Sequence, residues 1–170
     1  MNMKKLMTLA LSAVMVLCLA ACGQSAPRTQ PEEAGTESNV EIPNPFTDCE
    51  TLEEAADITG FDMAVPETLE GYDRPTIQVM SGTMIQVTYR NDNDGSVSIR
   101  KASGSDDISG DYNQYAQNDT VSVGELEVSM KGEQDLAYLA TWTNDGYTYA
   151  VSVSSGLSDD AMAELIAEIL

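Results

Sequence analysis

Apolar and polar residues alternate in several short segments between residues 77 and 154, and this pattern limits the possible folds more than any other. The clearest example is residues 147–154, with the sequence YTYAVSVS. Strict alternation over this length predicts a β-strand with one buried face. The preceding residues 144–146, Asn-Asp-Gly, are typical of a two-residue hairpin turn. The sequence therefore favours an antiparallel sheet built from hairpins.

Turn signals divide the rest of this region into further strands. Glycine-containing stretches at 81–82, 91–95 and 124–125 indicate hairpin connections. Residues 136–143 are apolar on both faces, which predicts a central strand. Gly156 is expected to end the last strand. The expected strands are 77–79, 85–89, 97–99, 121–123, 126–130, 136–143 and 147–154.

Two helices are predicted, one at each end of this region. Thr51 and Glu54 match a capping box and Gly60 is a C-cap signal, so a short helix is expected over 51–59. Ser158 is the expected N-cap of the last helix. Apolar residues follow it at helical spacing, namely Met162, Leu165, Ile166 and Ile169.

These elements predict an α+β fold. We expect an antiparallel sheet of about six or seven strands, with a short N-terminal helix and a C-terminal helix packed on one face. The longest connection is the polar segment 102–118. The bulkiest candidates for the interior between sheet and helices are Tyr138, Trp142, Tyr147 and Tyr149.

The N-terminus has the layout of a secretory signal peptide. Two lysines at 4–5 precede an apolar run over 6–19, which is shorter than the roughly 20 residues of a membrane-spanning helix. Alanines at 20–21 then precede Cys22, and this stretch resembles the lipobox of bacterial lipoproteins. The resemblance implies a lipoprotein signal peptide over 1–22, cleavage before the cysteine, and a diacylglyceryl group on its sulfur. An ordinary signal peptide and an uncleaved anchor are the alternatives.

The segment 23–45 is rich in Gly, Ser, Thr, Pro, Gln and Glu, which is typical of a disordered tether. A single α+β domain is expected over 46–170. The chain has 8 Lys+Arg against 28 Asp+Glu and a formal net charge of −20, so its surface repels nucleic acid and anionic lipid. We expect a domain at the extracytoplasmic face of the cell membrane, held there by its lipid anchor, with no nucleic-acid partner.

Cysteine and histidine usage limits the possible chemistry. Cys18 and Cys22 belong to the predicted signal region, so Cys49 has no partner for an intramolecular disulfide in the mature domain. The absence of histidine from the sequence removes the Ser-His-Asp and Cys-His arrangements and the usual zinc sites. With 28 acidic residues, carboxylate pairs arise by chance, so none singles out a glycosidase. We expect neither an enzyme nor a cofactor.

Three pieces of the C-terminal part carry a family resemblance. They are residues 52–66 (LEEAA leading to TGF and VP), 85–89 (IQVTY) and 141–158 (TW through GYTY to GLS). In this order and spacing, the segment from Cys49 to Leu170 resembles a domain of unknown function, number 4367, of bacterial lipoproteins and membrane-tethered proteins. The resemblance implies no established activity and no catalytic residues. The family's occurrence beside anti-sigma-type membrane proteins implies a link with envelope sensing.

The polar segment 102–118 holds the candidate site residues. Asp106, Asp107 and Asp111 share it and are candidates for a weak Ca²⁺ site, because Ca²⁺ takes carboxylate oxygens. The alternative is a solvated acidic loop. Tyr112 and Tyr115 are the expected exposed aromatic pair, and exposed aromatic residues in a loop indicate ligand recognition.

The sequence thus predicts a lipid-anchored, extracytoplasmic and non-enzymatic domain. We expect it to bind a partner protein or an envelope ligand through one sheet face or through residues 102–118. An envelope stress or signalling sensor associated with an anti-sigma protein is one alternative. A weak cation-dependent adhesion or ligand-binding module is the other.

Overall fold

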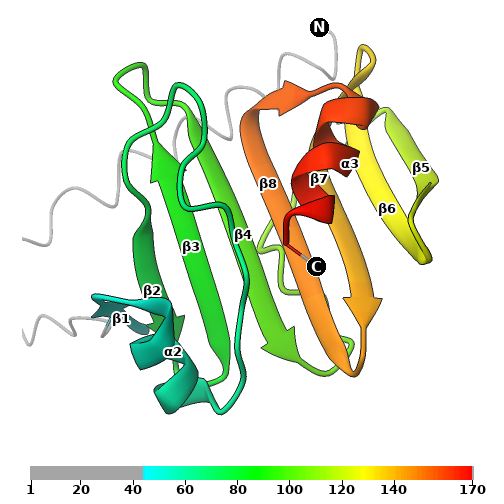
Figure 1. Cartoon of the computed structure of the whole chain (residues 1–170). Coiled ribbons are helices and arrows are strands. Elements are labelled where there is room, and N and C mark those ends of the chain that lie inside the picture. Colours follow the sequence, from blue (N-terminus) through cyan, green and yellow to red (C-terminus); the bar gives the residue numbers. More distant parts are fainter. Residues whose placement is uncertain (1–43, 170) are drawn as a thin grey trace, which may run out of the picture. The chain divides into compact units, whose positions relative to one another are not determined.

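The computed structural model of the chain describes residues 44–169 (Figure 1). The predicted signal peptide with Cys22, and nearly all of the predicted tether, lie outside these residues. The described part contains eight strands and two helices: β1 (Phe46–Cys49), α2 (Leu52–Thr59), β2 (Thr76–Met80), β3 (Met84–Arg90), β4 (Ser96–Ser103), β5 (Gln117–Val123), β6 (Leu126–Glu133), β7 (Leu136–Asn144), β8 (Tyr147–Leu157) and α3 (Asp159–Ala167).

The strands form one antiparallel sheet in the order β1-β2-β3-β4-β8-β7-β6-β5. The predicted antiparallel sheet is confirmed, but the prediction of six or seven strands is wrong, and the fold is mainly β rather than α+β. The strand that the sequence did not reveal is β1, which pairs with β2 from Phe46 opposite Met80 to Cys49 opposite Ile77. Its four residues, FTDC, are too few to show an alternating pattern.

Both helices begin at their predicted caps. The Thr51 hydroxyl accepts a hydrogen bond from the Glu54 amide at 3.2 Å, and Gly60 ends α2 with a φ of 81°. The Glu54 carboxylate accepts a hydrogen bond from the amide of Glu50, just before the cap, at 2.8 Å. The side chain of Ser158 caps α3 in the same way as that of Thr51. Local hydrogen bonds therefore set both helix starts.

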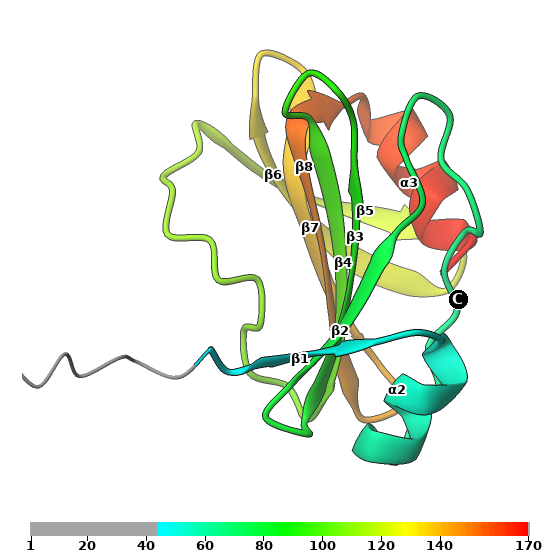
Figure 2. The ribbon, with the colours of Figure 1, turned by 90° about the vertical axis from the view of Figure 1, so that its left-hand side faces the viewer.

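Both helices cover the same face of the sheet (Figure 2). The core between them contains Val87, Ile99 and Val151 from neighbouring strands, together with Met162 and Ile166 of α3, all fully buried. Burial of such a side chain contributes about 1.5–3 kcal/mol. This one-sided core therefore stabilises the sheet and leaves the opposite face for other contacts.

The aromatic residues expected in this interior have different positions. Trp142 and Tyr149 are buried and stack with ring centroids 5.0 Å apart. Tyr147 is partly exposed and lies beside the ammonium group of Lys101, which is 4.4 Å from its ring centroid. Tyr138 stacks instead on Tyr115 of the connection after β4, at 6.1 Å. The prediction is therefore confirmed for Trp142 and Tyr149. It is confirmed in part for Tyr147, which packs against the core with its ring centroid 5.2 Å from that of the buried Phe61, and it is wrong for Tyr138.

The strand order determines the path of the longest connection. Strand β4 lies in the middle of the sheet, whereas β5, the next strand along the chain, forms its far edge. Residues 104–116, called the strap from here on, join the two and lie on the face opposite the helices (Figure 2). The remaining residues of the expected connection 102–118 belong to β4 and β5. Since neighbouring strands are about 4.8 Å apart, the strap has to cross the width of three strands.

The prediction that Gly156 ends the last strand is wrong. Strand β8 continues through it to Leu157, and Gly156 has a φ of 67° within the strand. The pairing of β7 with β8 shifts register between Ala137 and Leu139, so this glycine takes part in a bulge. The strand therefore bends here rather than stopping.

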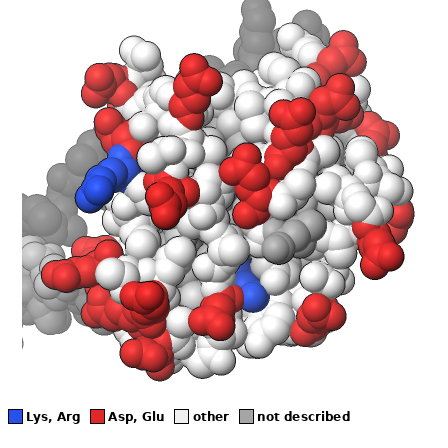
Figure 3. All heavy atoms as spheres, in the orientation of Figure 1, with Lys and Arg blue, Asp and Glu red and all other residues white. Residues whose placement is uncertain are grey.

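The helix-bearing face is acidic: Figure 3 shows Asp and Glu side chains spread over it, with few Lys or Arg. Neither described helix has the length and apolar character that crossing a bilayer requires.

Candidate functional site

A row of four polar side chains crosses strands β1 to β4 on the face opposite the helices. Asp48, Gln78, Gln86 and Arg100 are successive register partners in this row. The Gln78 amide donates to the Asp48 carboxylate at 2.7 Å, and the Gln86 amide donates to Gln78 Oε1 at 3.3 Å. Arg100 Nε donates to Gln86 Oε1 at 2.7 Å. Each glutamine therefore has one amide orientation that satisfies both neighbours.

The row ends at the strap. Arg100 Nη1 donates to the carbonyl oxygens of Ile108 at 2.9 Å and Ser109 at 2.6 Å. The next residue, Gly110, has a φ of 63°, and a Cβ there would lie 2.8 Å from Arg100 Nη1. A glycine is needed both for the backbone conformation and for the close approach. Arg100 thus fixes the middle of the strap to the sheet.

A second contact fixes the start of the strap. The Thr148 hydroxyl donates to the Gly104 carbonyl at 2.9 Å, and the Gly104 amide donates to the Gly146 carbonyl at 2.8 Å. Thr148 is buried although it faces away from the helices. The strap therefore begins at the β7–β8 hairpin and covers part of the second sheet face.

Arg100 lies in an unusual electrostatic setting for so acidic a chain. The guanidinium is half-buried, and the three acceptors just described are neutral oxygens. Burial lowers the pKa of Arg100. Removing a charged group from water is costly unless other charges or hydrogen bonds compensate for it. Here hydrogen bonds, rather than a carboxylate, hold the cation in place.

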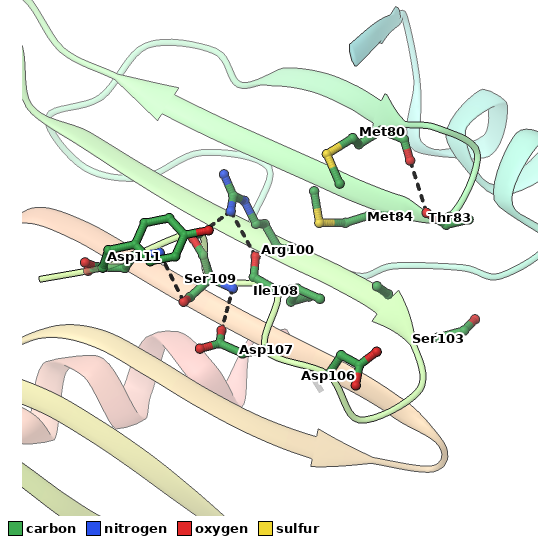
Figure 4. A pocket seen from close by; sticks show the side chains of 13 residues that line it. Met80, Thr83, Met84, Arg100, Ser103, Asp106, Asp107, Ile108, Ser109 and Asp111 are labelled. Carbon is green, nitrogen blue, oxygen red and sulfur yellow. Dashed lines mark hydrogen bonds between the residues drawn. The ribbon is translucent and has the colours of Figure 1, made fainter. Parts of the chain in front are cut away.

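A groove lies between the strap and strands β2 to β4, with a volume of about 470 Å³ (Figure 4). Met80, Met84, Ala102 and Ile108 give it apolar walls, and the Arg100 side chain lies among them. Small-molecule sites are mostly apolar clefts of about 300–1,000 Å³ with a few polar groups. The groove has this composition and size.

The strap separates this groove from a second hollow over β5 to β8, which has a volume of about 430 Å³. Asp106 and Asp107 line both hollows. Side chains with hydroxyl groups line the second one, among them Ser105, Thr120, Ser129, Thr141, Thr143 and Thr148.

The three candidate aspartates are all on the strap, but they do not converge on one point. Asp107 accepts a hydrogen bond from the Ser109 amide at 2.8 Å, and hydrogen bonds from Ser109 lower its pKa. Burial raises the pKa of Asp111, but hydrogen bonds from Tyr115 and Asn113 outweigh this effect and lower it. Asp106 is exposed. Between residues 44 and 169, no three acidic or cysteine side chains are grouped as a metal ion requires.

Tyr112 and Tyr115 do not form the expected exposed pair. Tyr112 is 96% exposed at the rim of the groove. Tyr115 is half-buried: it stacks on Tyr138 and donates to the Asp111 carboxylate at 2.5 Å. Tyr115 therefore anchors the end of the strap, and Tyr112 alone is available at the surface.

The most informative residues of the groove carry no recognisable signal in the sequence. Arg100, Gln86 and Met84 occupy the alternate positions of their strands that a two-residue period assigns to solvent. The one available signal was an arginine in the interior of a strand, and this is too common to indicate a site. The strap that buries these positions follows from strand order, which sequence periodicity does not contain.

Cys49 is partly exposed on the edge strand β1. Burial raises the pKa of its thiol, and the neighbouring carboxylates of Glu54 and Asp48 raise it further. A raised pKa disfavours the thiolate, which is the nucleophilic form.

Comparison with known protein families, curated proteins and solved structures found no match to this chain.

Proposed function

We propose that this chain is a lipid-anchored, extracytoplasmic domain that binds an envelope ligand without transforming it. The groove beside the strap carries the binding part of the proposal, because it combines apolar walls with a half-buried guanidinium. The location part rests on the lipobox-like sequence that ends at Cys22. The resemblance to domain of unknown function number 4367 remains a prediction that agrees with this location.

The groove lining favours binding over catalysis. It contains the hydroxyl groups of Thr83, Ser103 and Ser109, but none of its lining residues is a histidine, lysine or cysteine. Activation of a hydroxyl nucleophile requires an adjacent general base. The Asp107 and Asp111 carboxylates accept backbone and tyrosine hydrogen bonds, which favours their ionised form as fixed charges.

Native mass spectrometry of the full-length protein tests the binding role. The protein is incubated with a heat-treated envelope extract, and the small molecules that it retains are identified. Thr83 is exposed at the rim of the groove, so Thr83→Trp should fill the entrance and abolish retention. Asn93→Trp places the same side chain in the exposed β3–β4 loop and should retain the wild-type set. Retention of nothing by the wild type, or of the same set by Thr83→Trp, contradicts a binding role for the groove.

A further inference from the structure

The groove contains a cation that has unused hydrogen-bond donors. Nε and Nη1 of Arg100 are bonded to Gln86 and to the strap. The remaining amino group, Nη2, makes no hydrogen bond to any residue between 44 and 169, and Figure 4 shows a terminal nitrogen of this side chain pointing away from the strap. A half-buried guanidinium with a free amino group is a strong donor to a carboxylate or phosphate.

Negative charge lies on another part of the same groove. Asp106 and Asp107 belong to its lining on the strap side. Lys131, rather than Arg100, is the cation that contributes to lowering the pKa of Asp107. The acceptors of Arg100 are all neutral oxygens, and no carboxylate within residues 44–169 accepts a hydrogen bond from it. Asp111 also lines the groove, but its carboxylate accepts hydrogen bonds from Asn113 and Tyr115. The groove therefore has a positive pole at Arg100 and a negative pole at Asp106 and Asp107.

The walls between these poles are apolar and adaptable. Met84 and Ala102 are buried, and Met80 and Ile108 are half-buried at the edges of the groove. Methionine side chains are unbranched and polarizable, so they adapt to ligand groups of different shape. An apolar ligand side chain would be shielded from water here.

We propose that the groove binds a zwitterionic ligand with an apolar side chain, namely a short peptide with free termini. Its carboxylate would bind Arg100 Nη2, its ammonium group would face Asp106, and its apolar side chain would pack on Met84. A purely anionic ligand would be repelled by the aspartates and a purely cationic one by the arginine. This assignment rests on the proposed binding function and adds the chemical class of the ligand.

Isothermal titration calorimetry of the full-length protein at neutral pH tests the assignment, with the dipeptide alanyl-leucine as the probe. Its C-terminal amide lacks the carboxylate and should bind about tenfold more weakly. Its N-acetyl form lacks the ammonium group and should bind about two- to fivefold more weakly, since the rim aspartates are solvated. Alanyl-glycine lacks the apolar side chain, so its affinity should be about tenfold lower than that of alanyl-leucine.

A protein variant tests the second pole without disturbing the strap. Asp106 is exposed and makes no hydrogen bond within residues 44–169, so Asp106→Asn should leave the fold unchanged. This variant should bind alanyl-leucine about two- to fivefold more weakly than the wild type does, and its affinity for the N-acetyl form should be unchanged. Asp94→Asn removes an equal charge from the exposed β3–β4 loop and should change neither affinity.

The outcomes separate this assignment from the binding function itself. Equal affinity for all four dipeptides overturns the assigned ligand class and leaves the groove as a binding site. The ligand class is also overturned, and the binding site kept, if no dipeptide binds but the wild type retains a component of the envelope extract that Thr83→Trp does not retain. If neither experiment detects binding, both the ligand class and the proposed function are overturned.

Discussion

At the scale of single residues, the row from Asp48 to Arg100 connects the edge of the sheet with the strap. A carboxylate at one end and a guanidinium at the other orient the two glutamine amides between them. Because Arg100 is half-buried, a lost acceptor cannot be fully replaced by water. The row therefore stabilises the strap as well as the strands that carry it.

Gln86→Met should disrupt this row while preserving side-chain length. It removes the acceptor of Arg100 Nε and the donor to Gln78, so we expect the free energy of unfolding to fall by about 1–3 kcal/mol. Urea denaturation measures this change, and faster hydrogen exchange of the strap amides should accompany it. Gln114→Met, at an exposed strap position, should change stability by about 0.5 kcal/mol or less. Equal effects of the two substitutions would show that the row contributes no stability.

At the scale of elements, strand β8 shows how one residue bends a long strand. It pairs with β4 and β7 in the middle of the sheet and reaches α3 only after the bulge at Gly156. A Cβ at this position would lie 3.0 Å from Leu136 Cβ and 3.1 Å from the Tyr138 ring. Both the positive φ and the close packing therefore favour glycine.

Gly156→Ala separates these two causes when it is compared with Gly124→Ala. Gly124, in the β5–β6 turn, also has a positive φ, 61°, but a Cβ there would meet nothing within 4 Å. We expect Gly124→Ala to lower the free energy of unfolding by about 1–2 kcal/mol, from backbone strain alone. Gly156→Ala should lower the free energy of unfolding by about 1–3 kcal/mol more than Gly124→Ala does, because the added methyl group also crowds Leu136 and Tyr138. Thermal or urea denaturation gives both values, and equal losses would mean that the packing accommodates the extra methyl group.

At the scale of the whole molecule, acidity and the predicted lipid anchor act together. With a formal net charge of −20, the protein is repelled by anionic lipid surfaces, so its proposed place at the membrane depends on acylation rather than on surface charge. A diacyl group holds a protein far more firmly than a single chain, since each buried CH₂ contributes about 0.8 kcal/mol. We therefore expect the predicted acylation at Cys22 to decide where the protein is found.

Cys22→Ser tests this dependence by cell fractionation. Loss of the thiol prevents attachment of the diacylglyceryl group, so the protein should move from the envelope pellet to the soluble or secreted fraction. Cys49→Ser is the matched control, because it removes the thiol of the folded domain, and it should stay in the pellet. A Cys22→Ser protein found wholly in the pellet would contradict the lipid anchor.

The sequence by itself determined the features that depend on neighbouring residues. The caps at Thr51 and Ser158 and the hairpin at 144–146 are local hydrogen-bond and dihedral preferences, and the structure has each where it was predicted. Alternation also identified six of the strands, and the continuous apolar run at 136–143 identified β7. The four-residue strand β1 carries too little pattern, and at Gly156 a breaker signal competed with the pairing of β7 and β8.

The existence of the groove and the residues that line it follow only from the tertiary structure. Periodicity shows that a residue points to one face of a sheet, but it does not show which strand lies beside it or what covers that face. The return of β8 to pair with β4 places β5 at the far edge, and this sends the strap across the second face. Arg100 and Met84 become partly or fully buried for that reason. The groove is therefore a product of long-range strand pairing, which no local stretch of the sequence encodes.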